Sequence, residues 1–261
     1  MIHPITSRAN IRIKLAMALE KPSSCRKRNR FLMEGPKFIR DHLSRHGSID
    51  FVVLSQQASK EAAMVAEAAD SSGHSVIQVP EDIFAGISNT ETPQGITAIC
   101  PTPEYSTDDL FTGKTVLVLD RIADPGNAGT AIRSASAFGC SGVIFLKGSV
   151  FPWSPKVTRS AAGINSAIPI CEVDDLKEIQ AKHSGYCFLG ARSDGRPMAE
   201  LFNDLAKPVC IIIGSEAHGI SQTSESLISD AVSIPMVKDV ESLNAGVSAS
   251  ILLSNLFRKN S

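Results

Sequence analysis

Short apolar runs alternate with amphipathic stretches along the first hundred residues of the chain. Mostly apolar runs bounded by turn residues predict strands, at 31–34, 51–54, 76–79 and 96–100. Apolar residues at helical spacing predict helices between them, at 7–20, 36–45, 59–70 and in a short segment after Pro80. This alternation predicts a compact α/β domain of about 100 residues.

The second half of the chain continues the alternation, with more continuous apolar runs. The first run, KTVLVLD at 114–120, is typical of a strand buried in a parallel sheet. Further strands are expected at 143–146, 168–171, 186–191 and 209–213, and in a short run that ends at 235–236. Helices are expected at 128–138, 156–162, 176–183 and 198–201, and at the C-terminus from 244 on. This order predicts a parallel sheet covered by helices on both faces.

Between the two halves, residues 101–113 contain two prolines and two adjacent aspartates and show no apolar periodicity. Such a composition is typical of a linker. We therefore predict an N-terminal domain at 1–103, a linker at 104–113 and a C-terminal domain at 114–261. Both domains belong to the α/β class.

Three polar loops follow strands of the C-terminal domain, at 120–133, 214–220 and 236–244. In open α/β sheets, ligands bind at the carboxyl ends of the strands, where such loops begin. Gly126 and Gly129 in the first loop allow a close approach of the backbone to a ligand, but there is no G-x-G-x-x-G fingerprint of dinucleotide binding. The three loops together predict one binding site.

The composition excludes several classes of protein. With 43% hydrophobic and 20% charged residues in 261, the chain is suited to a packed core rather than to disorder. Its apolar runs are far too short to cross a bilayer, and its N-terminus lacks the apolar core of a signal peptide. Six cysteines are scattered without a C-x-x-C pair, which indicates a reduced, cytoplasmic protein without a zinc site.

The net charge of −1 conceals an uneven distribution. Residues 1–46 contain eleven Lys or Arg and three acidic residues, with the densest cluster, CRKRNR, at 25–30. A basic arm on an otherwise acidic protein is an electrostatic footprint for nucleic acid. The alternative interpretation is a solvated helix face near the terminus.

The polar residues of the loops also have structural explanations. Asn127 could cap the helix that follows it, with Arg133 on the surface of that helix. Glu216 could cap a helix after Gly214, and Ser242 and Asn244 could cap the last helix. Elsewhere, Trp153 could stack on a base, although packing is the more common role of a lone aromatic in a Pro-rich loop.

Taken together, the three loops resemble the sequence motifs of a known protein family. The loop DRIADPGNAGTAIR at 120–133 resembles motif one of the SpoU/TrmH family of RNA ribose 2′-O-methyltransferases, within the SPOUT superfamily. GSEAHGI at 214–220 resembles motif two, and IPM at 234–236 with ESLN at 241–244 resembles motif three. PKVTRSAAG at 155–163 and TPQG at 92–95 are similar to further family segments. Ala217 departs from the family pattern, which often has Gly there.

The resemblance implies a fold and a cofactor. The C-terminal domain should contain a deep trefoil knot, and the smaller N-terminal domain should bind the RNA substrate with a fold similar to a ribosomal protein. The knotted loops should hold S-adenosylmethionine, and the family works as a homodimer. Gly214, Ile234 and Leu243 should contact the cofactor, with Met236 and Ser242 in the same loops. Gly190, at the end of the preceding strand, is a further candidate.

The resemblance also implies catalytic roles. Arg133 should position the RNA phosphate and the ribose hydroxyl, Asn127 and Glu216 should orient Arg133, and Asn244 should help to shape the acceptor site. No metal is expected, because the sulfonium methyl group is already activated for transfer. The full N-terminal domain is similar to the thiostrepton-resistance-like branch and favours ribosomal RNA of the 23S type. The alternatives are the same reaction on tRNA, or a non-catalytic RNA-binding or ribosome-assembly factor.

Overall fold

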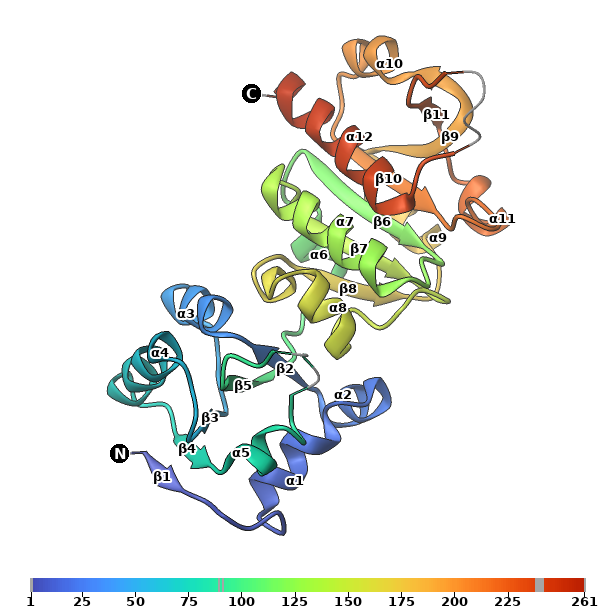
Figure 1. Ribbon diagram of the computed structural model, residues 1–261. Helices are drawn as coiled ribbons and strands as arrows, with labels where there is room; N and C mark the ends of the chain where they lie inside the picture. The colour runs from blue at the N-terminus through green and yellow to red at the C-terminus, as the bar shows by residue number, and fades with distance from the viewer. Residues whose placement is uncertain (1, 89, 91, 238–241, 261) are drawn as a thin grey trace. The chain divides into compact units, whose positions relative to one another are not determined.

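The computed structural model describes residues 2–88, 90, 92–237 and 242–260. The chain forms two compact units (Figure 1). The first unit contains Met1–Pro103 together with Trp153–Ala167, and the second contains Glu104–Pro152 together with Ile168–Ser261. Glu241, which belongs to the motif-three resemblance, lies outside the described residues.

The first unit is built on a mixed sheet with the strand order β1-β4-β3-β5-β2. Its strands are β1 (His3–Pro4), β2 (Arg30–Glu34), β3 (Phe51–Ser55), β4 (Val76–Val79) and β5 (Ile96–Pro101). Its helices are α1 (Ile11–Ala18), α2 (Pro22–Arg28), α3 (Pro36–Ser44), α4 (Lys60–Ser71) and α5 (Glu81–Phe84). β3 pairs with β4 in parallel, whereas β5 is antiparallel to both β3 and β2. The predicted α/β alternation of this half is confirmed.

One helix of the first unit was not predicted. α2 has the sequence PSSCRKR, which has no apolar stripe and therefore lacks the signal used to predict helices. It begins with a proline in the first turn, which suits a helix start, and it buries Cys25. It ends at Asn29, which adopts the left-handed conformation (φ 49°) of a typical helix C-cap.

The 153–167 segment packs with the first unit, although it lies within the predicted C-terminal domain. It contains α8 (Pro155–Ser160) and the 3₁₀ helix η1 (Ile164–Ser166). Trp153 is 3% exposed, and its ring lies 4.9 Å from that of Phe31 in β2. Ser166 Oγ lies 3.0 Å from Nδ1 of the buried His42. The packing interpretation of Trp153 is therefore confirmed.

The second unit is built on a sheet with the strand order β11-β9-β10-β6-β7-β8, in which every pairing is parallel. Its strands are β6 (Thr115–Asp120), β7 (Gly142–Leu146), β8 (Ile170–Val173), β9 (Cys187–Pro197), β10 (Val209–Gly214) and β11 (Asp230–Ser233). Its helices are α6 (Thr107–Leu110), α7 (Pro125–Ala137), α9 (Lys177–Lys182), α10 (Met198–Asp204), α11 (Gln222–Glu225) and α12 (Ala245–Asn260).

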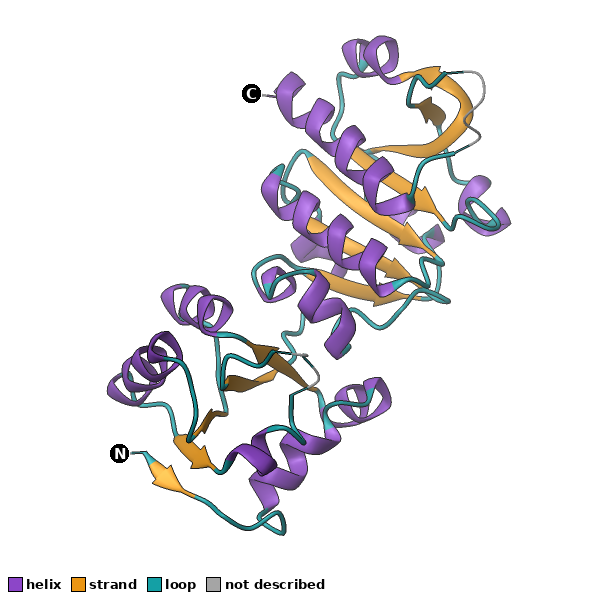
Figure 2. Ribbon diagram, viewed as in Figure 1, coloured by secondary structure: helices purple, strands orange, loops and turns teal. Residues whose placement is uncertain are grey.

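Helices cover both faces of this sheet, as predicted. Figure 2 shows α7 and α12 side by side on one face, where they are in contact with each other. On the other face, Leu110 of α6 and Ile179 of α9 join a buried cluster with Phe188, Cys210 and Ile212 of the strands. The central strands β6 and β10 are therefore buried on both sides, which explains their continuous apolar sequences.

The predicted linker, residues 104–113, is a packed part of the second unit. Ser106 and Asp109 form a capping box at the start of α6, so the acidic residues of this stretch serve a helix. Leu110 is fully buried, and a Cβ atom added at Gly142 would lie 2.2 Å from its Cγ. The polar composition of this stretch thus accompanies the start of a short helix.

The cysteines act as small apolar residues. All six are free thiols, and five of them are buried. Burial raises the pKa of the thiols of Cys25 and Cys140 to about 12, so neither forms a thiolate at neutral pH. Within the described ranges, no helix is long and apolar enough to cross a membrane.

We predict that Trp153→Ala lowers the free energy of unfolding by about 3–5 kcal/mol, because it leaves a cavity beside Phe31. Denaturant unfolding followed by circular dichroism measures the change. Lys156→Ala, at an exposed position of α8, should stay within about 0.5 kcal/mol of the unaltered protein. Equal stability of the two variants would contradict the packing role of the 153–167 segment.

Candidate active site

The register of the sheet brings two of the predicted loops together. β10 pairs with β6 so that Gly214 lies opposite Asp120, the last residues of the two strands. The loops that follow therefore begin side by side at one edge of the sheet. The third polar stretch, of which residues 238–241 lie outside the described residues, ends at the start of α12, which packs against α7.

Three of the predicted catalytic residues form a continuous network, called here the Asn127 network. Asn127 Nδ2 donates a hydrogen bond to Glu216 Oε1. Asn244 Nδ2 donates to Asn127 Oδ1 at 2.6 Å. Asn127 and Glu216 are 89 positions apart in the chain, and Asn127 and Asn244 are 117 positions apart. Both polar ends of the Asn127 amide are thus engaged, so its orientation is set by its neighbours.

The helix caps explain why these side chains are available. Asp124, rather than Asn127, caps α7, since its Oδ1 accepts from Asn127 N at 2.8 Å. The capping interpretation of Asn127 is therefore wrong. Glu216 caps no helix either, because residues 215–219 form a turn and Ser221 caps α11. Asn244 does cap α12, since its Oδ1 accepts from Val247 N at 3.2 Å, while its amide nitrogen serves the network.

Arg133 does not join the Asn127 network in this chain. It lies six residues beyond Asn127 on α7, which corresponds to a shift of about 9 Å along the helix axis and a different face. Its side chain is exposed, and it makes no hydrogen bond or ion pair with any described residue. The structure therefore shows no contact by which Asn127 and Glu216 could orient Arg133.

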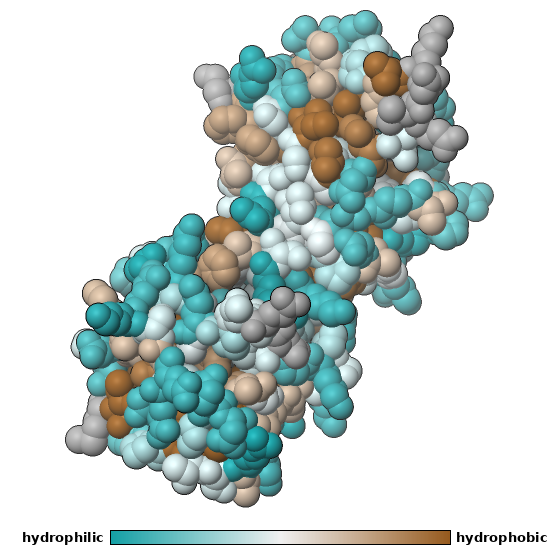
Figure 3. All heavy atoms as spheres, in the orientation of Figure 1, coloured by the Kyte–Doolittle hydropathy of each residue, from teal (hydrophilic) through white to brown (hydrophobic). Residues whose placement is uncertain are grey.

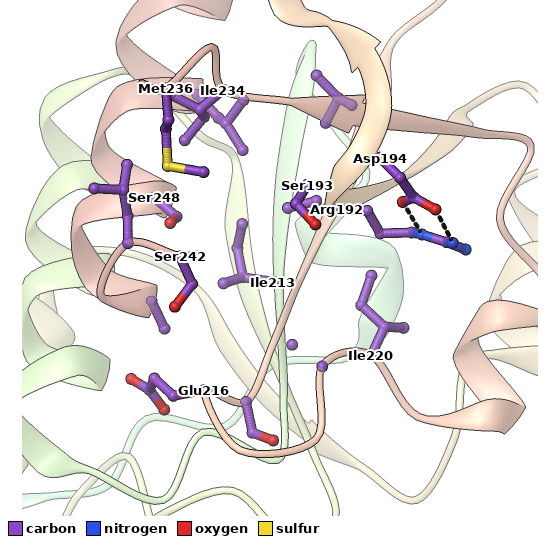
Figure 4. A pocket seen from close by; sticks show the side chains of 18 residues that line it. Arg192, Ser193, Asp194, Ile213, Glu216, Ile220, Ile234, Met236, Ser242 and Ser248 are labelled. Carbon is purple, nitrogen blue, oxygen red and sulfur yellow. Dashed lines mark hydrogen bonds and ion pairs between the residues drawn. The ribbon is translucent and has the colours of Figure 1, made fainter. Parts of the chain in front are cut away.

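A cavity of about 490 Å³ opens beside the network (Figure 4). This volume lies within the range of small-molecule sites. Figure 4 shows Met236 and Ser248 on one side of the cavity, Arg192 and Asp194 on the other, and Glu216 at its edge. Five of the six predicted cofactor-binding residues line it, namely Gly214, Ile234, Met236, Ser242 and Leu243. The lining combines apolar side chains and serine hydroxyls with the charged Arg192, Asp194 and Glu216. Such a lining suits a ligand that has both an apolar ring and polar groups.

Glycine is required at one position on the cavity wall. A Cβ atom at Gly214 would lie 2.2 Å from the carbonyl carbon of Gly219, so the turn could not close back on β10. Gly190 does not line the cavity. A Cβ atom there would lie 2.3 Å from Ile228 Cδ1 and 2.9 Å from Ile220 Cδ1, so this glycine allows side chains to pack against β9.

Arg192 and Asp194 line the cavity but were not predicted. Arg192 Nε and Nη2 donate to the two carboxylate oxygens of Asp194 at 2.9 and 2.7 Å, and Nη1 donates to Glu225 of α11. The hydrogen bonds to Asp194 raise the pKa of Arg192 and lower that of Asp194. β9 runs to Pro197, well past its expected end at 191, which is why these residues were not expected on the cavity wall.

Throughout the described part of the chain, no group of three or more His, Cys, Asp or Glu side chains is arranged to hold a metal ion. His218, in the turn after Gly214, is exposed and its backbone nitrogen donates to Ser215 Oγ at 3.2 Å.

Comparison with known proteins gives two family matches. Residues 114–254 match the SpoU rRNA Methylase family, and residues 10–98 match the MRM3-like substrate binding domain. The first match covers more than half of the chain. It contains all the residues proposed for the site from the sequence.

Individual relatives cover from 70% to 98% of the chain. The 23S rRNA (guanosine(2553)-2′-O)-methyltransferase RlmP of Bacillus subtilis is 30% identical over 97% of this chain and 98% of its own length. A putative TrmH family tRNA/rRNA methyltransferase of Staphylococcus saprophyticus is 33% identical over 70% of this chain and 77% of its own. The crystal structure of an AdoMet-bound rRNA methyltransferase from Sinorhizobium meliloti matches with a TM-score of 0.85 at 26% identity, covering 98% of each chain.

These matches confirm the resemblance drawn from the three loops and the fold class. The trefoil knot of the C-terminal segment stays a prediction that follows from this relationship. With matches of this extent to the family model and to full-length relatives, the chain belongs to the SpoU rRNA methylase family.

Proposed function

We propose that the protein transfers a methyl group from S-adenosylmethionine to a ribose 2′-hydroxyl of ribosomal RNA. The observation that carries this proposal is the Asn127 network at the edge of the cavity lined by Gly214, Ile234 and Leu243. The Asn127 network places oriented polar groups beside a pocket whose size suits a nucleoside-like cofactor. A binding module that lacked activity would have no use for this combination.

The residues around the cavity fit S-adenosylmethionine. Ile234, Met236 and Leu243 offer apolar surface for the adenine ring, and the Ser242 and Ser248 hydroxyls offer partners for polar groups. The space that a side chain at Gly214 would fill is taken by the turn that forms one wall of the cavity. When bound, the cofactor supplies a methyl group already activated on a positively charged sulfur.

The chain's own residues have to align the acceptor and handle its proton. Arg133 is exposed and makes no hydrogen bond or ion pair with a described residue, so its guanidinium is available to an RNA phosphate and the neighbouring hydroxyl. Because a guanidinium stays protonated, Arg133 positions these groups, and the hydroxyl proton passes to solvent water late in the displacement. The Asn127 network holds Glu216 and the first turn of α12 in place and so shapes the acceptor site.

Three observations support ribosomal RNA as the proposed substrate. The full-length relative from Bacillus subtilis is named for 23S rRNA, and the first unit matches a substrate binding domain. The exposed Arg26, Lys27 and Arg28 of the last turn of α2 suit a phosphate backbone. The Staphylococcus relative is named for both tRNA and rRNA, which keeps tRNA as the alternative substrate.

We also propose that the protein acts as a homodimer in the cytoplasm. Figure 3 shows apolar side chains exposed on the face of the second unit that carries α12. Val247 and Phe257 of that helix are 43% and 45% exposed, although large apolar residues usually lie inside. A second copy of this face would cover them. Free thiols, as found at all six cysteines, persist in a reducing compartment.

The first test is methyl transfer from labelled S-adenosylmethionine to bulk ribosomal RNA and bulk tRNA. We expect label in ribosomal RNA, with one phosphodiester becoming resistant to alkaline cleavage, because a 2′-O-methyl group blocks attack by that oxygen. Arg133→Ala should lower turnover about 100-fold or more, since a misplaced acceptor reacts slowly. Unchanged turnover of this variant would show that Arg133 has no role in the mechanism. Label found only in tRNA would show that the substrate is tRNA instead of ribosomal RNA.

A second variant separates the two roles of Asn244. Asn244→Asp keeps an oxygen that caps α12, so stability should stay within about 1 kcal/mol. It loses the amide that donates to Asn127 Oδ1, and we expect kcat to fall about tenfold or more. Asn244→Ser, which also retains a capping oxygen but adds no charge, is the matched control for electrostatics. Full activity of both variants would show that the network is not needed.

The role of α2 is tested by neutralising Arg26, Lys27 and Arg28 to Gln together. If they contact phosphates, RNA affinity falls, and the slope of log affinity against log salt becomes shallower by about 2 to 3. The slope is measured by fluorescence anisotropy with labelled ribosomal RNA fragments. The control neutralises Lys177 and Lys207, exposed residues of the second unit. An unaltered slope in the α2 variant would place RNA binding elsewhere.

A further inference from the structure

The last residue of β6 and the one after it combine a buried charge with an uncommon backbone conformation. Asp120 is 1% exposed. Arg121 has a φ of 59°, in the left-handed region that favours glycine. A buried carboxylate and a left-handed arginine each cost free energy, and such features persist where the surrounding structure holds them in place. Neither residue has a role in the function proposed above.

Both side chains reach the same part of the neighbouring loop. Asp120 Oδ2 accepts a hydrogen bond from Ser221 N at 2.7 Å, and its Oδ1 lies 3.5 Å from Arg121 Nε. Arg121 Nη2 donates to the carbonyl oxygen of Gly219 at 3.5 Å. Two adjacent residues of one strand end therefore hold two positions, 219 and 221, at the returning end of the loop that follows β10.

The conformation of Arg121 is supported from a third loop. Its side chain crosses Gly148, where an added Cβ atom would lie 3.1 Å from Arg121 Cγ. Ser149 Oγ donates to Leu119 O at 3.0 Å and accepts from Ile122 N at 3.1 Å, which holds the chain on both sides of Arg121. The left-handed backbone thus directs the guanidinium toward Gly219.

The loop at 214–221 needs such support because much of it is exposed. Residues 216–219 are exposed, and the turn is closed by reciprocal backbone hydrogen bonds between Ser215 and Gly219. The same loop carries Glu216 of the Asn127 network and contributes Gly214, Gly219 and Ile220 to the cavity wall. A shift at its returning end would change the cavity and the network together.

We propose that Asp120 and Arg121 are positioning residues that clamp the 214–221 loop and so complete the cofactor cavity. The inference rests on the proposed function for the identity of the ligand, but the clamp itself is a property of the free protein. Asp120 acts through the Ser221 amide and Arg121 acts through the Gly219 carbonyl. Neither residue has to touch the reacting atoms.

The test uses Asp120→Asn and Arg121→Gly in the full chain. Asp120→Asn keeps the size of the side chain but removes the charge that holds Ser221 N and faces Arg121. Arg121→Gly removes the anchor and relieves the positive φ, so it should fold at least as well as the parent. Lys147→Gln, at an exposed position after β7, is the matched charge control.

Two measurements are compared. By calorimetry, the dissociation constant for S-adenosylmethionine should rise about tenfold in each clamp variant, the size of a lost charge-assisted hydrogen bond. By hydrogen exchange, the peptide that covers 214–221 should exchange faster in the clamp variants while β6 and β10 keep their protection. Lys147→Gln should change none of these quantities.

Unchanged cofactor affinity in both clamp variants overturns the proposal. If Asp120→Asn does not fold, Arg121→Gly decides the outcome. If the parent protein binds no S-adenosylmethionine, the proposed function fails instead. In that case the hydrogen-exchange rate of the 214–221 peptide still tests whether Asp120 and Arg121 hold the loop. An unaltered rate in Arg121→Gly would contradict the clamp.

Discussion

The parallel pairing of β6 with β10 is the constraint on which the site depends. Both strands are continuous apolar runs with helices on either side, so their place at the centre of the sheet is fixed by burial. Their register sets Asp120 opposite Gly214. Because the two strands end level with each other, the loops that follow meet. The Asn127–Glu216 contact, the cavity wall and the support at Ser221 all follow from that alignment.

Much of this arrangement could be predicted from the sequence, because it depends on periodicity and on strand ends. The apolar runs at 114–120 and 209–213 are strands in the structure, and the polar residues Asn127, Glu216 and Asn244 meet as their positions after strands suggested. The parallel direction of the sheet also followed from the alternation of strands and helices. Local sequence patterns are enough to predict a site when the site is formed by strand ends that meet at one edge of a sheet.

The remaining features depend on contacts between distant residues, which no local pattern records. α2 has no apolar stripe and is completed by burial of Cys25. Asp124 rather than Asn127 takes the capping position of α7, a choice between two good capping residues three positions apart. The position of Trp153 against Phe31 depends on residues more than one hundred positions apart.

The 153–167 segment has a consequence for how such proteins can be recombined. The chain leaves the first unit after Pro103, re-enters it at Trp153 and leaves it again after Ala167. The first unit is therefore encoded in two separate stretches of the gene. A fusion or exchange at the single junction after Pro103 would transfer a substrate binding domain that lacks Trp153 of its own core. Exchange of substrate specificity between relatives would have to move both stretches together.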